Sequence, residues 1–129
     1  MTHFRDHRFY LVRLPDGEFR AFYDLDPYQA SRLSAEPARA RCRLVWHGPE
    51  DPANRSLLEG FGHPEGLFRE PCQLNTFTVL GERIYGPAHA DLDQYHVKAD
   101  GLVEVDLTRV ICGVGLEGPR RRCAAQLNR

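Results

Sequence analysis

The sequence has one lysine, Lys98, one tryptophan, one methionine and no long apolar run among its 129 residues. A helix that spans a bilayer needs about 20 consecutive apolar residues, so no direct membrane span is expected. The opening MTHFRDHRFYLVRL lacks the apolar centre of a secretory signal. We therefore expect a cytoplasmic protein, one exported or membrane-associated through a partner complex, or one whose leader has been removed.

The net charge of the chain and the catalytic motifs that it lacks exclude further classes of protein. The formal net charge is −1, so no basic field exists to attract phosphates and nucleic acid is not an expected partner. The chain has no Gly-x-Ser-x-Gly, no phosphate-cradling glycine loop and no His-Glu-x-x-His helix. These absences predict a non-catalytic protein. The length predicts a single domain over residues 1–129.

The clearest structural signals in the sequence are those of two β-hairpins. Apolar and aromatic runs lie on both sides of Pro15-Asp16-Gly17 in the segment RFYLVRLPDGEFRAFYD. Apolar and polar residues alternate on both sides of Asp100-Gly101 in the segment QYHVKADGLVEVDL. Asp-Gly favours hairpin turns that need a positive φ. Shorter strands are expected at Thr76–Val79 and Arg83–Tyr85, so the fold is predicted to be mainly β.

Helical signals are few. Asp26 followed by Pro27 predicts the start of a helix of a turn or two, which Pro37 ends. The segment from His47 to Gly66 is rich in Gly, Pro, Asn and Asp, which indicates a long surface loop with a helical turn at Arg55–Glu59. Loops of this length in small domains are commonly functional.

Residues 9–107 together resemble a Rieske domain, with residues 108–129 as a C-terminal extension. FYLVRLPDGEFRAFYD resembles the lead-in to the family's first cluster loop. FREPCQLNTF resembles the second loop, and the following Gly-Pro-Ala and closing hairpin continue the match without a gap. The resemblance implies a Rieske-like antiparallel β-sandwich or barrel with a short helix and long loops.

The residues that would bind the [2Fe–2S] cluster are absent. A Rieske site needs two Cys and two His. In the second loop the ligand positions fall on Glu70 and Gln73, and in the first loop on Asp26 and Tyr28. A second placement of the first loop, with its last Cys on Cys42, puts the ligand positions on Pro37 and Arg39. Both placements lack a thiolate or imidazole, so we expect no cofactor.

The resemblance also implies a disulfide between Cys42 and Cys72, the positions that clip the two loops together. Two free thiols in a reducing compartment are the alternative. Cys112 and Cys123 lie beyond the resemblance, and their spacing permits a second bridge.

The available cysteines and histidines offer one alternative metal site. It would combine Cys42, His47 and Cys72 with one more histidine, namely His63, His89 or His96. Zinc accepts such ligands, but the set lacks a short paired spacing, so no metal site is expected.

The resemblance implies an accessory or structural subunit of a respiratory or photosynthetic electron-transfer complex, bound to redox subunits in a hetero-oligomer. Two alternatives remain: a small subunit resembling that of assimilatory nitrite reductase, suggested by DPYQASRLS, and a true Rieske [2Fe–2S] carrier with unusual ligands. Docking is expected through the tip segments Asp26–Ser31, Glu70–Asn75 and Gly86–His89 with the long loop. The candidate anchors are Tyr28, Phe61, Arg69 and Leu74.

Overall fold

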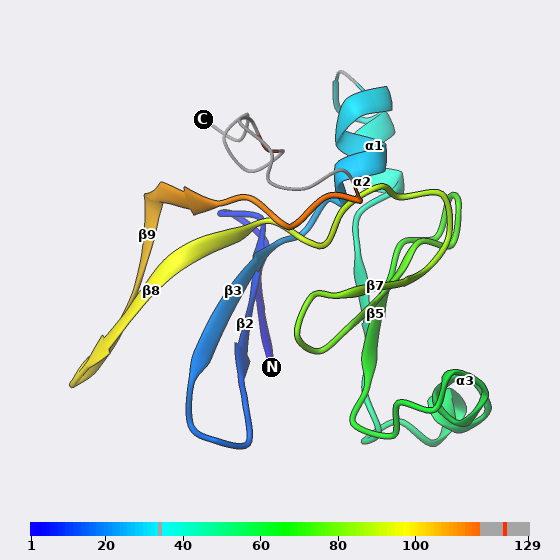
Figure 1. Cartoon of the computed structure of the whole chain (residues 1–129), viewed down its shortest axis with the longest axis horizontal. Helices are drawn as coiled ribbons and strands as arrows, with labels where there is room; N and C mark the ends of the chain where they lie inside the picture. Colours follow the sequence, from blue (N-terminus) through cyan, green and yellow to red (C-terminus); the bar gives the residue numbers. More distant parts are fainter. Residues whose placement is uncertain (34, 117–122, 124–129) are drawn as a thin grey trace.

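A computed structural model describes residues 1–33, 35–116 and 123. In these residues the fold is mainly β, as the sequence predicts, with two antiparallel sheets, short helices and long loops (Figure 1). Most of the C-terminal extension, residues 117–122 and 124–129, lies outside the described part of the chain. The longest described helix has seven residues, so no described helix is able to cross a bilayer.

The larger sheet has the strand order β1-β2-β3-β8-β9. Both predicted hairpins belong to it. Its strands are β1 (Thr2–Phe4), β2 (Phe9–Arg13), β3 (Phe19–Tyr23), β8 (Gln94–Asp100) and β9 (Leu102–Ile111). Gly17 and Gly101 adopt φ values of 90° and 98° at the two hairpin turns, where glycine avoids the steric cost that other residues meet.

The smaller sheet has the order β4-β5-β6-β7. Its strands are β4 (Val45–His47), β5 (Leu67–Arg69), β6 (Thr76–Thr78) and β7 (Arg83–Tyr85). The predicted strands at 76–79 and 83–85 are present as β6 and β7, whereas β1, β4 and β5 were not expected.

The helices are α1 (Pro27–Arg32), α2 (Ala38–Arg41) and α3 (Arg55–Phe61), with a 3₁₀ turn at Pro52–Asn54. Asp26 caps α1, because its carboxylate accepts hydrogen bonds from the backbone N–H groups of Tyr28 and Gln29. The predicted helix of a turn or two is present, but the prediction that Pro37 ends it was wrong: α1 ends at Arg32, and Pro37 precedes α2 instead. Helix α3 extends the turn predicted inside the long loop.

The main core lies between the two sheets. The Phe68 ring of β5 packs against Tyr10 of β2 and Phe22 of β3, with ring centroids 5.1 Å and 5.8 Å apart. A second apolar cluster, built around Phe9, Tyr23 and Tyr95, lies on the other face of the larger sheet. The larger sheet is therefore apolar on both faces along much of β3, which gives the tip loops a rigid support.

Candidate functional site

The three tip segments, residues 26–31, 70–75 and 86–89, meet through one buried side chain. Asn75 is fully buried. Its Nδ2 donates to Asp26 Oδ1 at 3.3 Å, and its Oδ1 accepts a bond from Ala88 N at 2.9 Å. A single amide thus connects the first loop, the second loop and the Gly-Pro-Ala loop.

Gly86 allows this close approach. It has a φ of 101°, and a Cβ atom at this position would lie 2.3 Å from Asn75 Oδ1. Any larger residue would force the Gly-Pro-Ala loop away from Asn75. The Gly-Pro-Ala turn therefore has a packing role that does not depend on a metal.

Glu70 holds the second loop from inside. Its side chain is fully buried. Its carboxylate accepts backbone hydrogen bonds from Cys72 and Gln73, both at 2.7 Å, and from Asn75 at 3.1 Å. A carboxylate that accepts several N–H groups is well stabilised for a buried charge. The loop therefore folds around the Glu70 side chain.

Asp26 and Glu70 together form a buried carboxyl pair beneath the tip. Asp26 is fully buried, and its Oδ2 atom has no hydrogen-bond partner among the described residues. Burial is the main cause that raises the pKa of Asp26 to about 7; the N–H of Gln29 opposes this rise, and the charge on Glu70 adds to it. The protonation of Asp26 therefore changes near neutral pH.

Of the other two predicted ligand positions, Gln73 lies at the surface and Tyr28 is half-buried against the main core. Gln73 is exposed and contributes only its backbone N–H to Glu70. The Tyr28 hydroxyl accepts a hydrogen bond from Arg32, and the Tyr28 ring lies edge-on to His89 with centroids 6.4 Å apart. Glu70 has its oxygens committed to the loop and Asp26 is engaged as a helix cap, so these four residues do not fit a [2Fe–2S] cluster.

The predicted Cys42–Cys72 disulfide is present. The Cα atoms lie 5.4 Å apart, within the range that a disulfide requires. Cys42 is buried, Cys72 is exposed, and the bridge ties the end of α2 to the second loop. The alternative metal set is not assembled in the described residues, because both of its cysteines are in the bridge and His47 Nδ1 lies 3.2 Å from Asn54 Oδ1.

Removing this bridge is expected to destabilise the fold. We expect Cys42→Ser combined with Cys72→Ser to lower the free energy of unfolding by about 3 kcal/mol, because a cross-link over some thirty residues restricts the unfolded chain. Urea unfolding of the double variant and the oxidised parent chain measures this difference. Equal midpoints and slopes would contradict the stabilising role of the bridge.

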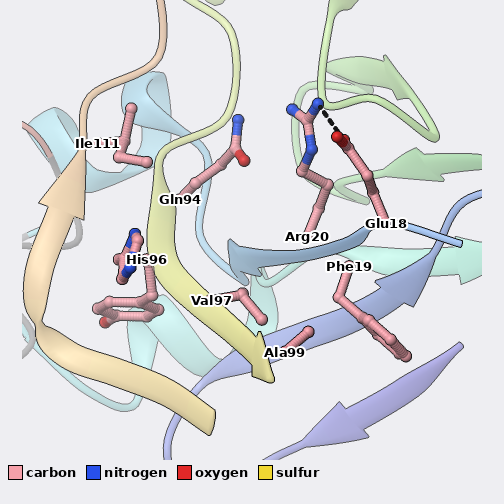
Figure 2. A pocket seen from close by; sticks show the side chains of 9 residues that line it. Glu18, Phe19, Arg20, Gln94, His96, Val97, Ala99 and Ile111 are labelled. Atoms are coloured by element: carbon pink, nitrogen blue, oxygen red, sulfur yellow. Dashed lines mark hydrogen bonds and ion pairs between the residues drawn. The ribbon is translucent and has the colours of Figure 1, made fainter. Parts of the chain in front are cut away.

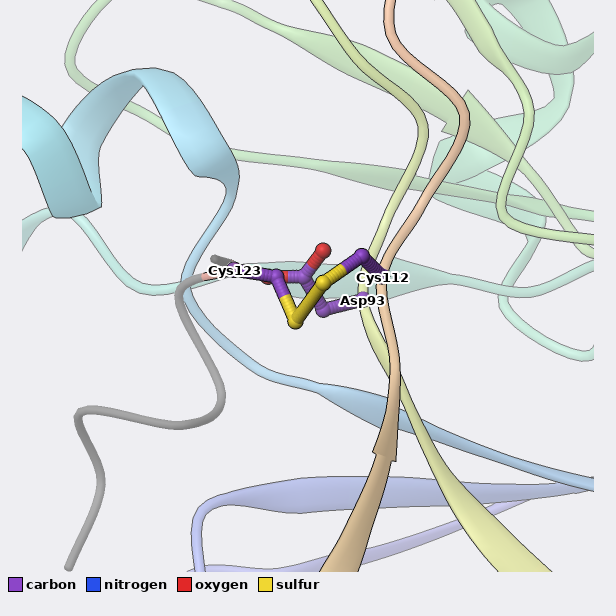
Figure 3. A group of neighbouring side chains, drawn as sticks. All are labelled: Asp93, Cys112 and Cys123. Atoms are coloured by element: carbon purple, nitrogen blue, oxygen red, sulfur yellow. A yellow bond between two sulfur atoms is a disulfide. The ribbon is translucent and has the colours of Figure 1, made fainter. Parts of the chain in front are cut away.

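Cys112 and Cys123 form the second bridge that their spacing permitted, with Cα atoms 5.2 Å apart. The buried Asp93 carboxylate lies beside this disulfide (Figure 3) and also accepts a hydrogen bond from Gly113 N. Both sulfurs are in the disulfide, so neither is a thiolate able to ligate a metal. Within the described residues this is the one group with metal-ligating side chains close together.

Two of the candidate docking residues, Tyr28 and Leu74, belong to the tip segments, and the other two, Phe61 and Arg69, lie outside them. Tyr28 lies at the tip, and Leu74 lies there with 42% of its surface exposed. Phe61 and Arg69 contact each other, with the guanidinium carbon 5.6 Å from the ring centroid. The long loop leaves the small sheet after His47, which pairs with Leu67, whereas Val45 and Arg69 pair at the opposite end, beside the tip. The tip and the long loop therefore start from opposite ends of β4 and β5 (Figure 1).

Sequence reasoning did not identify the role of Asn75. It has no special spacing in the sequence, and only its burial between three loops gives the amide its function as a connector.

No protein-family model matches the chain, and no curated protein or solved structure is significantly similar to it.

Proposed function

We propose that this chain is a cluster-less Rieske-like accessory subunit of a respiratory or photosynthetic electron-transfer complex whose other subunits carry the electrons. The observation that supports this most strongly is the Glu70 carboxylate, which stands at a cysteine-ligand position of the resemblance and accepts three backbone hydrogen bonds. The loops keep their arrangement through the chain's own side chains. This favours a structural role over electron transfer.

The tip has the properties of a docking surface. Leu74 is exposed and adopts a φ of 63°, a conformation that is costly for a leucine and that glycine would adopt more easily. An exposed apolar residue held in an unfavourable backbone conformation supports a role in contact with a partner. Tyr85, also at this end of the small sheet, is 50% exposed.

Charge around the tip supports a partner with an acidic face. The carboxylates within the tip segments, Asp26 and Glu70, are fully buried. Arg32 and Arg41 are exposed beside them, and neither has an ion pair with a described carboxylate. Arg41 adjoins the tip, because its carbonyl oxygen lies 3.6 Å from Cys72 Sγ. Complementary charge steers association and selects partners.

The cysteines favour this proposal over a small subunit resembling that of assimilatory nitrite reductase. Each of the four cysteines is in a disulfide, and stable disulfides are typical of oxidising compartments. A cytosolic nitrite reductase subunit has no need of these bridges. We therefore infer that the chain and its redox partner face an oxidising compartment.

The test is co-expression of the chain with the redox proteins encoded by neighbouring genes. We expect a hetero-oligomer whose affinity falls at least tenfold when Arg32→Glu and Arg41→Glu are combined, and which weakens with added salt. Arg109→Glu, at an exposed position of β9 outside the tip segments and the long loop, is the matched control and should leave the affinity unchanged.

The same purified complex distinguishes the alternatives. Iron and acid-labile sulfide should be absent from this chain when it is isolated from its partners. Two irons per chain would instead indicate a true [2Fe–2S] carrier. Binding to a cytosolic nitrite reductase, or a chain that stays monomeric with every redox neighbour, would contradict the proposal.

A further inference from the structure

The two hairpins of the larger sheet separate after a short stretch of pairing. Strand β3 pairs with β8 only at Ala21 with Tyr95 and at Phe22 with Gln94. Beyond these pairs the β2–β3 hairpin and the β8–β9 hairpin diverge (Figure 1). The first residues of β3 and the last four residues of β8 therefore face a gap within the sheet.

A bulge in β9 accompanies this divergence. The register between β8 and β9 shifts from Tyr95 opposite Val110 to His96 opposite Asp106, which leaves three extra residues in β9. Asp106 stabilises this irregularity, because its Oδ1 accepts hydrogen bonds from the backbone N–H and the hydroxyl of Thr108. Bulges bend the strand and increase its twist, so the divergence of the hairpins has a local structural cause.

The gap forms an open pocket of about 340 Å³. Its walls are the start of β3 and the length of β8, with Ile111 of β9 beside the first residues of β8. Val97 and Ala99 extend from β8 toward Phe19 of β3 (Figure 2). Glu18 and Arg20, which form an ion pair with a distance of 3.3 Å, lie on the β3 wall. The pocket is open to solvent, and its walls are strands.

Backbone groups on these walls are positioned to continue a ladder. Tyr23 N donates to Asp93 O at 3.0 Å, and Ala21 pairs with Tyr95 two residues further along. Antiparallel pairs of this kind recur every second residue, so the next pair would join Phe19 and Val97. No such pair forms in the described sheet. Val97 and Ala99 line the pocket, and by the same alternation their backbone N–H and C=O groups are directed toward it.

The side chains around the pocket separate onto two faces. Ala21, Tyr95 and Val97 belong to the apolar cluster on one face of the sheet. Phe19 and Ala99 share that face by alternation, whereas Arg20 and His96 point to the other. A strand in this position would therefore meet an apolar surface on one side and polar groups on the other.

We propose that this pocket binds an extended segment of a partner protein, which adds as a strand between β3 and β8. Main-chain hydrogen bonds to Val97 and Phe19 provide affinity, and the alternating surface selects a segment in which apolar and polar residues alternate. A strand is the occupant that satisfies backbone groups on both walls. This site is separate from the tip, so it stands independently of the proposed function.

The probe is a random peptide library, about nine residues or roughly 30 Å when extended, selected on the oxidised full chain. We expect the enriched peptides to alternate apolar and polar residues. Hydrogen exchange should show that a bound peptide protects the amides of Val97 and Ala99. N-methylation of alternate peptide amides should weaken binding at least tenfold, because it removes ladder donors.

Ala99→Asp is expected to weaken peptide binding at least tenfold, and Ala99 is exposed, so this variant should still fold. Leu102→Asp, at the exposed hairpin end, is the matched control and should bind like the parent chain. The proposal is overturned if no peptide is enriched, if enriched peptides lack alternation, or if N-methylated peptides bind equally well. Protection of the outer edge of β9 alone, or closure of the pocket by a second copy of the chain, would also overturn it.

Discussion

Replacement of Glu70 by alanine is expected to lower the free energy of unfolding by about 4 kcal/mol. The substitution removes the acceptor for the N–H groups of Cys72, Gln73 and Asn75 and leaves a cavity beneath the tip. The buried Asn75 N–H costs roughly 1–3 kcal/mol when left without an acceptor, and the part-buried N–H groups of Cys72 and Gln73 cost less. Loss of a buried side chain of this size adds to that cost. Relief of the repulsion from Asp26 offsets only part of the loss.

Two further variants separate the causes of this effect. Glu70→Gln keeps the volume and one acceptor oxygen, so we expect a loss of about half that of Glu70→Ala, measured by urea unfolding at pH 8. Glu59→Ala, on the exposed side of α3, should change the stability by less than about 0.5 kcal/mol. A loss for Glu70→Ala as small as that of Glu59→Ala would show that the loop does not depend on its internal carboxylate.

The stability of the chain is expected to fall as the pH rises from about 4 to 8, because of Asp26. Its pKa is raised from 3.8 to about 7, chiefly by burial, so the folded state binds a proton that the unfolded state has released. A group whose pKa is higher in the folded state than in the unfolded state stabilises the fold at pH values below its unfolded-state pKa. This stabilisation is lost as the pH rises through the folded-state pKa. The free energy of unfolding is therefore expected to differ between pH 4 and pH 8 by roughly 3–4 kcal/mol, at about 1.4 kcal/mol per pKa unit.

Asp26→Asn tests this directly. Asparagine also caps helices, so its Oδ1 is able to accept the N–H groups of Tyr28 and Gln29. We expect the variant to be more stable than the parent chain at pH 8, similar to it at pH 5, and nearly independent of pH between these values. Glu70→Gln should move the pH dependence of the parent chain to lower pH, since the charge on Glu70 contributes to the shift. A parent chain that becomes more stable from pH 5 to 8 would contradict this reading.

The sequence determined the elements whose signals are local. Asp16-Gly17 and Asp100-Gly101 specify hairpin turns because glycine adopts a positive φ there, and alternating apolar residues specify the flanking strands. Asp26 before Pro27 specifies the start of α1 in the same local way. The end of α1 was not predictable from Pro37, because the chain leaves the helix at Leu33 before the proline is reached.

The tertiary structure decided what the tip residues do. Glu70 and Asp26 lie 44 positions apart in the sequence, and only the meeting of two loops buries both carboxyl groups and shifts the pKa of Asp26. Asn75 becomes a connector because its amide reaches Asp26 and Ala88 at the same time. The gap between β3 and β8 likewise depends on a register shift in β9, which a residue pattern with a period of two does not encode. Burial and pairing between distant segments are properties of the assembled chain, so the sequence predicted the positions of these residues but not their chemistry.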